Sequence, residues 1–333
     1  MAVEKRRLGK TEIEITPIGL GCWQFGKMNG PLNFFKTPPQ DEVDKIVKIA
    51  LEGGINWFDT AEAYGKGNSE RALSKALSNA GRTREDVVIA TKWFPMSPLP
   101  GVDFPFFLRT ARSISSTITK RQECLSPYRV DLFQIHRPWS ISSIEAQMDE
   151  MAALVKAGKI RSVGVSQFSP AQMRRAHSAL AKHGIPLASN QVWFNLVHRN
   201  PERNGVLGTA RELNITIIAY SPLSQGLLTG KFHKDPELVK KLPFLRRRMT
   251  VSRVLIEKSR PLIKTLEDIA RSYNCSAAEV ALSWTVNVHS DSIVAIPGAS
   301  KTEHVLQNIR ALKLKLTSQE MAKLDELSRV TTQ

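Results

Sequence analysis

The chain has few cysteines and no long apolar run, and each shortage excludes a class of protein. Its three cysteines, Cys22, Cys124 and Cys275, are too few and too far apart for a disulfide framework, and they lack metal-ligand spacing. No stretch reaches the roughly 18 apolar residues of a membrane span, and the N-terminus is too charged for a signal peptide. We therefore expect a cytoplasmic protein with unpaired thiols, no metal site and no membrane association.

A recognisable nucleic-acid-binding module is also missing, although the chain is strongly basic. It carries 47 Lys and Arg residues against 31 Asp and Glu residues, for a formal net charge of +16. The densest basic runs, Lys240–Lys241 and residues 246–248, are short and the remaining basic residues are scattered. We interpret the charge as a solvated basic surface and expect no specific nucleic-acid partner, with an independent nucleic-acid site as an open alternative.

The glycine-rich turn of dinucleotide-binding open sheets is absent as well. Residues 19–26 contain glycines but miss the GxGxxG spacing, which disfavours a doubly wound sheet. Instead, apolar strand-like segments alternate with amphipathic helical ones, which is typical of a parallel sheet. The predicted strands are 18–21, 55–59, 87–91, 132–136, 160–165, 187–192, 216–220 and 293–296.

Eight strands of this kind predict an α/β fold, a (β/α)8 TIM barrel, formed by residues 1–333 as one domain. An N-terminal β-hairpin over residues 7–15 and an extra C-terminal helix over 318–329 complete it. The predicted intervening helices are 43–51, 69–77, 107–124, 143–157, 170–182, 201–213, 255–273 and 277–288. Two long stretches, 95–106 and 226–253, are predicted to be irregular loops of functional importance.

Four titratable residues lie at or just after the ends of three successive strands. Asp59 ends the second strand with Tyr64 in the loop that follows, while Lys92 and His136 end the third and fourth. Each alone is more often structural, as a cap, a surface lysine or a core histidine. Because strand ends meet on one face of a barrel, we expect the four side chains to lie together.

Together the four residues suit proton transfer to a carbonyl oxygen. A tyrosine hydroxyl with a pKa near 10 donates a proton more readily when an ammonium group stabilises the phenolate. Lys92 fits that role with Asp59 holding it, and His136 could donate a hydrogen bond to the developing oxyanion. Since no serine or cysteine nucleophile motif is apparent, a bound cofactor that supplies hydride completes the site most simply.

The sequence resembles the aldo-keto reductase family of NADP(H)-dependent barrel enzymes across nearly its whole length. The resemblance lies in the stretches Gly54–Gly65, Thr91–Lys92, Ile135–Pro138, Gly158–Ser166, Asn190–Val192, Ala219–Leu223 and Ile296–Ser300. It implies that Asp59, Tyr64, Lys92 and His136 form the catalytic tetrad of an enzyme that reduces aldehydes, and ketones as a second class, with Tyr64 as the general acid.

The resemblance also implies an NADP(H) site along strands five to eight. Ser166, Gln167 and Gln191 would bind the nicotinamide carboxamide, Tyr220 would stack on the ring, and Ser221, Pro222, Leu223 and Gly226 would approach the pyrophosphate. Gly298, Ser300, Lys301, Gln307 and Asn308 would hold the adenosine 2′-phosphate end, where helix N–H groups favour an anion. Gln167, Trp139, Ser300 and His304 depart from the residues that the family commonly has at these positions.

Aromatic residues that follow the strands predict an apolar substrate pocket. Trp23, Trp93 and Trp139 are the main candidates, and they favour aromatic or other apolar aldehydes as the small-molecule carbonyl substrate. A cofactor-sensing regulatory subunit, like the potassium-channel β subunits that share this fold, is the alternative function. We expect a monomer or a small homo-oligomer.

Overall fold

The computed structural model describes residues 3–26, 37–98, 106–242, 247 and 252–332. Parts of the two long predicted loops, residues 99–105, 243–246 and 248–251, lie outside the described residues, as do Arg246 and Arg248 of the second basic run. None of the helices in the described ranges is long and apolar enough to cross a membrane.

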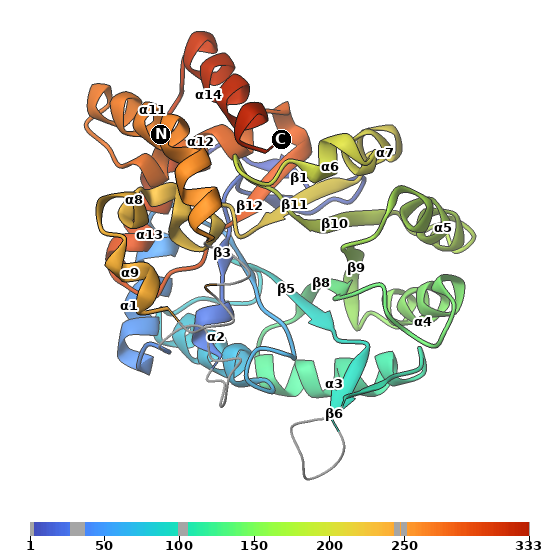
Figure 1. Ribbon diagram of the computed structural model, residues 1–333. Helices are drawn as coiled ribbons and strands as arrows, with labels where there is room; N and C mark the ends of the chain where they lie inside the picture. The colour runs from blue at the N-terminus through green and yellow to red at the C-terminus, as the bar shows by residue number, and fades with distance from the viewer. Residues whose placement is uncertain (1–2, 27–36, 99–105, 243–246, 248–251, 333) are drawn as a thin grey trace.

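Eight parallel strands form the central sheet, as predicted (Figure 1). In spatial order the sheet runs β12-β11-β10-β9-β8-β5-β4-β3. The two edge strands also meet, through parallel bridges from Ile18 to Ala295 and from Gly21 to Gly298, which close the sheet into a barrel. The strands are β3 (Leu20–Gly21), β4 (Trp57–Asp59), β5 (Val88–Trp93), β8 (Val130–Ile135), β9 (Ile160–Ser166), β10 (Leu187–Trp193), β11 (Thr216–Tyr220) and β12 (Ile293–Ile296).

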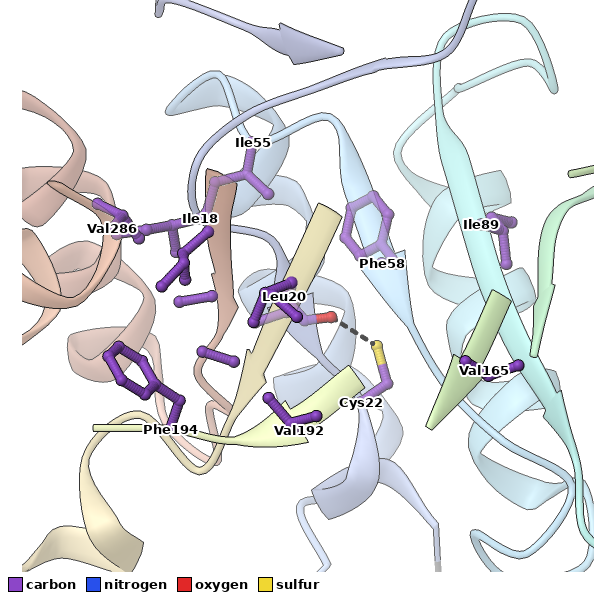
Figure 2. Packing of buried hydrophobic residues seen from close by; sticks show 14 of the residues in the cluster. Ile18, Leu20, Cys22, Ile55, Phe58, Ile89, Val165, Val192, Phe194 and Val286 are labelled. Carbon is purple, nitrogen blue, oxygen red and sulfur yellow. Dashed lines mark hydrogen bonds between the residues drawn. The ribbon is translucent and has the colours of Figure 1, made fainter. Parts of the chain in front are cut away.

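Helices surround the barrel, and buried apolar residues of the longer helices join those of the strands in one core cluster. The helices that follow strands are α1 (Gln40–Glu52), α2 (Asn68–Asn79), α3 (Ser113–Leu125), α4 (Ile144–Lys156), α5 (Pro170–Ala181), α6 (Asn200–Arg203), α7 (Val206–Leu213), α12 (Ala277–Asn287) and α13 (Thr302–Lys313). The additional long helices are α11 (Arg253–Ser272) and α14 (Ser318–Thr331). Figure 2 shows the resulting core near β3, where Leu20 and Cys22 lie among Phe58, Val192 and Phe194.

The predicted N-terminal hairpin is present and covers one end of the barrel. Strands β1 (Arg6–Arg7) and β2 (Glu14–Ile15) pair antiparallel. Leu8, Ile13 and Ile15 are buried in a cluster with inward-facing strand residues such as Trp57 and Ala188. The hairpin therefore closes the end of the barrel opposite to the carboxyl ends of the strands.

Two local predictions differ from the structure. The helix predicted over 107–124 begins only at Ser113, because Phe106–Leu108 is a strand (β7) that pairs antiparallel with Met96–Pro98 (β6). The segment 201–213 contains two helices, because Gly205 adopts a left-handed conformation with φ of +82° between α6 and α7.

The stretch 226–253 is also more regular than predicted where the structure describes it. It contains the end of the 3₁₀ segment η3 (Ser224–Thr229) and the short helices α8 (Lys231–Lys234) and α9 (Glu237–Lys240). The described residues also contain the 3₁₀ turns η1 (Trp23–Phe25) and η4 (Ser290–Ser292).

Candidate active site

The carboxyl ends of three neighbouring strands bring the four predicted titratable residues together. Asp59 is the last residue of β4, Lys92 lies near the end of β5, and His136 directly follows β8. Tyr64 reaches the same place from the loop after β4. All four side chains therefore meet at one end of the barrel, as the alternation of strands and helices predicts.

Lys92 is the centre of this cluster. Its side chain is fully buried, and Nζ donates to Asp59 Oδ1 at 2.5 Å, to the Thr60 carbonyl oxygen at 2.8 Å and to the Tyr64 hydroxyl at 3.4 Å. Burial alone would lower the pKa of Lys92, but the charge of Asp59 and the nearby Tyr64 hydroxyl outweigh it and raise the pKa. The ammonium group is therefore charged at neutral pH.

Two glutamines hold the second oxygen of Asp59. Gln191 Nε2 donates to Asp59 Oδ2 at 2.9 Å, and Gln134 Nε2 donates to the same oxygen at 3.2 Å. Sequence reasoning missed Gln134, although an amide in the apolar strand Val130–Ile135 is a signal that could have identified it. Asp59 is thus fixed by an ammonium group on one oxygen and two amides on the other.

The Tyr64 and His136 side chains contact each other within the cluster. Their rings meet edge to face with centroids 5.8 Å apart, and the Phe94 ring lies 5.3 Å from the imidazole. Burial and the charges of Lys92 and Arg137 hold the pKa of His136 well below its usual value, so the ring is neutral at pH 7. A neutral imidazole can donate one hydrogen bond without bringing a positive charge.

The pKa of Tyr64 is governed by two opposing effects. Burial raises the pKa above its ordinary value, and the charge of Lys92 acts against that rise without cancelling it. Tyr64 therefore keeps its proton at neutral pH, and the ammonium group beside it is placed to stabilise a phenolate.

The residues predicted for the nicotinamide end lie at the ends of β9, β10 and β11. Ser166 Oγ donates to the carbonyl oxygen of Gln191 at 2.9 Å. Gln167 adopts a left-handed conformation with φ of +63°, and its amide donates to the Tyr220 hydroxyl. Asparagine tolerates this conformation better than glutamine does, so Gln167 occupies a strained position at the mouth of the barrel.

The turn predicted to approach the pyrophosphate has an unusual backbone. Ser221 and Gly226 both have positive φ, at +49° and +98°, and Asn195 Nδ2 holds the Ser221 carbonyl oxygen at 2.9 Å. Pro222 is buried between them, and Leu223 accepts a hydrogen bond from the Gly226 N–H at 3.0 Å. This turn places successive backbone groups close to the strand ends.

The residues predicted for the adenosine end surround the start of α13. Gly298 pairs with Gly21, Ser300 and Lys301 directly precede the helix, and Gln307 and Asn308 lie within it. The Glu42 carboxylate accepts a hydrogen bond from the Thr302 N–H at 3.1 Å, so the helix N-terminus already contacts one acid. We did not predict this contact from the sequence.

Several buried polar atoms at this end of the barrel lack a hydrogen-bond partner among the described residues. They include Nδ1 of His136, Oε1 of Gln24, Nδ2 of Asn308 and Nε1 of Trp193. The Gln24 amide lies against the bare backbone of Gly298, where a Cβ would stand 2.2 Å from Oε1. Unsatisfied buried groups of this kind are rare. They fit a site that holds a polar ligand extended from His136 to Asn308.

The three tryptophans predicted to line the substrate pocket lie in different surroundings. Trp23 packs 6.2 Å from the Tyr64 ring, and Trp139 is 54% exposed with the Arg137 guanidinium 5.4 Å from its ring. The structure places Trp93 in the hydrophobic core instead, fully buried with its indole N–H on Ser113 Oγ at 3.0 Å. Only Trp23 and Trp139 lie where a substrate could reach them.

Comparison with known proteins agrees with this geometry. A model of the aldo/keto reductase family matches residues 17–329. The chain is 37% identical over 320 residues to an uncharacterized oxidoreductase of Mycobacterium bovis, covering 95% of this chain and 90% of the relative. It is 31% identical to the chloroplastic pyridoxal reductase of Arabidopsis thaliana, covering 94% of this chain and 83% of the relative.

Solved structures share the fold over their full length. A glycerol dehydrogenase from Gluconobacter oxydans superimposes with a TM-score of 0.84 at 27% identity, covering 100% of this chain and 98% of the other. A thermostable aldo-keto reductase in complex with the inhibitor epalrestat gives a TM-score of 0.74 at 29% identity, covering 97% and 99%. The chain therefore belongs to the aldo/keto reductase family of oxidoreductases.

Proposed function

We propose that the protein is an NADP(H)-dependent reductase that converts aldehydes, and ketones as a second class, to alcohols. The observation that carries this proposal is the fully buried Lys92 ammonium group, held by Asp59 at 2.5 Å and set against the Tyr64 hydroxyl at 3.4 Å. A charged amine in this position serves a phenol that must lose and regain a proton.

Each of the four residues has a separate part in the reaction. Tyr64 donates its proton to the carbonyl oxygen of the substrate, and Lys92 stabilises the phenolate that remains. Neutral His136 donates a hydrogen bond to the same oxygen as negative charge develops on it. Asp59 touches neither the substrate nor the proton, and keeps Lys92 charged and in place.

The nicotinamide cofactor would supply the hydride when bound, and the residues along β9 to β12 fit it. Ser166, Gln167 and Gln191 would hold the carboxamide. Gln191 uses Nε2 as the donor to Asp59, so its Oε1 is the atom available to accept from the carboxamide. At the other end, Lys301 and the N-terminus of α13 would hold the 2′-phosphate, with Asn308 as a further donor.

The names of two relatives support a carbonyl substrate. The Arabidopsis thaliana relative is a pyridoxal reductase, and the structural neighbour from Gluconobacter oxydans is a glycerol dehydrogenase. Both names describe interconversion of an alcohol and a carbonyl group. For this chain, Trp23 beside Tyr64 and the exposed Trp139 favour substrates with an apolar or aromatic body.

Replacement of the proton donor tests the proposal. Tyr64→Phe removes the hydroxyl and keeps the ring, so it should lower aldehyde-dependent NADPH oxidation by at least about 100-fold while NADPH still binds. The assay measures steady-state rates with a panel of aldehydes and ketones, and fluorescence titration measures cofactor affinity. Unchanged turnover in Tyr64→Phe would contradict the assignment. Absence of turnover by the wild-type protein on the whole panel would refute the proposed function.

A further inference from the structure

Glu62 links the loop that carries Tyr64 to the end of the neighbouring strand. It lies two residues before Tyr64, and its Oε1 accepts a hydrogen bond from the Phe94 main-chain N–H at 2.5 Å. The same oxygen accepts from Arg109 Nη1 at 2.8 Å. One carboxylate oxygen therefore joins the loop after β4, the end of β5 and the segment before α3.

Arg109 completes the link from the other side of Phe94. Its Nη1 also donates to the Phe94 carbonyl oxygen at 3.1 Å. Glu62 therefore binds the main-chain N–H of Phe94, and Arg109 binds its main-chain carbonyl oxygen. The guanidinium is itself anchored on Ser113 and Thr117 of α3 and lies 5.7 Å from the Trp93 ring. The position of Arg109 is thus fixed by α3 independently of its contact with Glu62.

The ion pair is largely shielded from water. The side chains of Arg109 and Glu62 are only 19% and 15% exposed. Exposed pairs such as Arg175 with Glu145, at 52% and 42%, are screened by solvent and contribute little. The Glu62–Arg109 pair is therefore able to hold its loop in one place.

Phe94, held in this way, packs against His136. The Phe94 ring meets the imidazole edge on at 5.3 Å, and the main-chain N–H of His136 donates to the Trp93 carbonyl oxygen at 2.9 Å. His136 in turn meets the Tyr64 ring at 5.8 Å. Glu62, two residues before Tyr64 in the same loop, thus contacts Phe94. Phe94 contacts His136, and His136 contacts Tyr64.

These contacts restrict the position of Tyr64 relative to His136, which the contacts within the tetrad do not. Lys92 Nζ lies 3.4 Å from the Tyr64 hydroxyl, against 2.5 Å from Asp59, so it holds the phenol only weakly. Proton donation and oxyanion binding by Tyr64 and His136 require both groups to reach the same carbonyl oxygen. Small errors in their spacing are costly.

We propose that Glu62 and Arg109 are positioning residues, which clamp Phe94 and so set the spacing between Tyr64 and His136. The inference rests on the proposed reductase function, because it assigns these residues to the proton-transfer step of that reaction. Neither residue touches the substrate or the reacting atoms. Their removal should affect kcat and leave cofactor binding almost unchanged.

Graded substitutions at Glu62 test this role. Glu62→Ala removes both contacts, whereas Glu62→Gln keeps an oxygen that accepts from the Phe94 N–H and loses the charge that holds Arg109. We expect kcat for aldehyde reduction to fall about 100-fold in Glu62→Ala, with Glu62→Gln between that variant and the wild type. The dissociation constant for NADPH, from fluorescence quenching, should stay within about twofold. Glu145→Ala, which breaks the exposed pair with Arg175, is the matched control and should keep the wild-type kcat.

Other results would overturn the inference. A folded Glu62→Ala or Glu62→Gln protein with the wild-type kcat would do so, as would a loss of activity matched by an equal loss of NADPH affinity. If Glu62→Ala fails to fold, the Gln variant decides the outcome, with its thermal midpoint measured alongside. Tyr64→Phe on the same substrate separates the two hypotheses: if it remains active, the proposed function fails. If it is inactive while the Glu62 variants are fully active, only the positioning role fails.

Discussion

Gln191 donates a hydrogen bond to Asp59 across the barrel over 2.9 Å, although the two residues are 132 positions apart in the chain. Gln134, on a strand between theirs, donates to the same carboxylate oxygen and accepts from Gln191 at 3.4 Å. The three side chains form one buried polar network beneath Lys92. Such a network is stable only while every member keeps its partners.

Substitution of Gln134 should therefore disturb both stability and catalysis. Gln134→Leu has a similar volume and leaves Asp59 Oδ2 with one donor instead of two. We expect the free energy of unfolding, from urea titration, to fall by about 1–3 kcal/mol, and kcat to fall as well because Asp59 no longer holds Lys92 firmly. Wild-type stability and kcat in this variant would show that Gln191 alone is sufficient.

The pH dependence of reduction should reflect Tyr64 and not His136. Burial raises the pKa of Tyr64 above its usual value near 10, so the rate should decline only at strongly alkaline pH, as the phenol loses its proton. The pKa of His136 lies well below about 6.5, so its protonation should produce no inflection near that pH. The measurement is kcat/KM against pH. An inflection near pH 6.5 that disappears in His136→Gln would contradict this.

Glu42 should influence the choice between NADPH and NADH. Its carboxylate accepts from the Thr302 N–H at the start of α13, where the 2′-phosphate is proposed to bind. Glu42→Gln removes a negative charge there, which should tighten NADPH binding about two- to fivefold and leave NADH binding unchanged. Fluorescence titration with both cofactors tests this, and Glu52→Gln at the far end of α1 is the control. Equal changes for the two cofactors would contradict the prediction.

Arg199 should be important for stability and unimportant for chemistry. Its side chain is 1% exposed, donates to Glu202, Asp325 and Ser328, and lies 4.8 Å from the Trp284 ring. It thereby attaches α14 to the segment after β10. Arg199→Ala removes these hydrogen bonds from a buried position, leaving Glu202 with His289 and Asp325 with Arg329, and should destabilise the protein by about 1.5–3 kcal/mol, with kcat at 25 °C unchanged. Arg329→Ala, at a more exposed pair with Asp325, should have little effect on the thermal midpoint.

The sequence was sufficient to predict the barrel and the meeting of the four titratable residues. Parallel strands bring their carboxyl ends to one face. Because Asp59, Lys92 and His136 lie at the ends of their strands, they were predicted to be neighbours. The pairing of β6 with β7 could not be predicted, because Phe107 and Leu108 are apolar residues that also fit the first turn of a helix. Their exposure of 51% and 45% follows from tertiary pairing with β6.

Contacts that depend on side-chain reach were also beyond the sequence pattern. Glu62 contacts Arg109 from 47 residues away, and Glu42 reaches Thr302 from 260 residues away. Neither separation follows from strand order. Trp93 is a second example. Its place at the end of an apolar strand predicted a residue of the substrate pocket, but in the structure its ring points toward α3 in the core. The direction of a side chain at a strand end depends on the local register, which apolar periodicity does not give.

The bridges between the β3 and β12 regions affect when the barrel can close during synthesis of the chain. The first barrel strand has one neighbour, β4, close by in the sequence, but its other edge is closed only by residues near Ala295 and Gly298. Arg6 likewise binds the carbonyl oxygens of Val286 and Ile293. During synthesis this first barrel strand therefore cannot be paired on that edge until the residues near Ala295 and Gly298 have left the ribosome. Closure of the barrel therefore waits for these late residues, and until then the nascent chain exposes a strand edge that chaperones can protect.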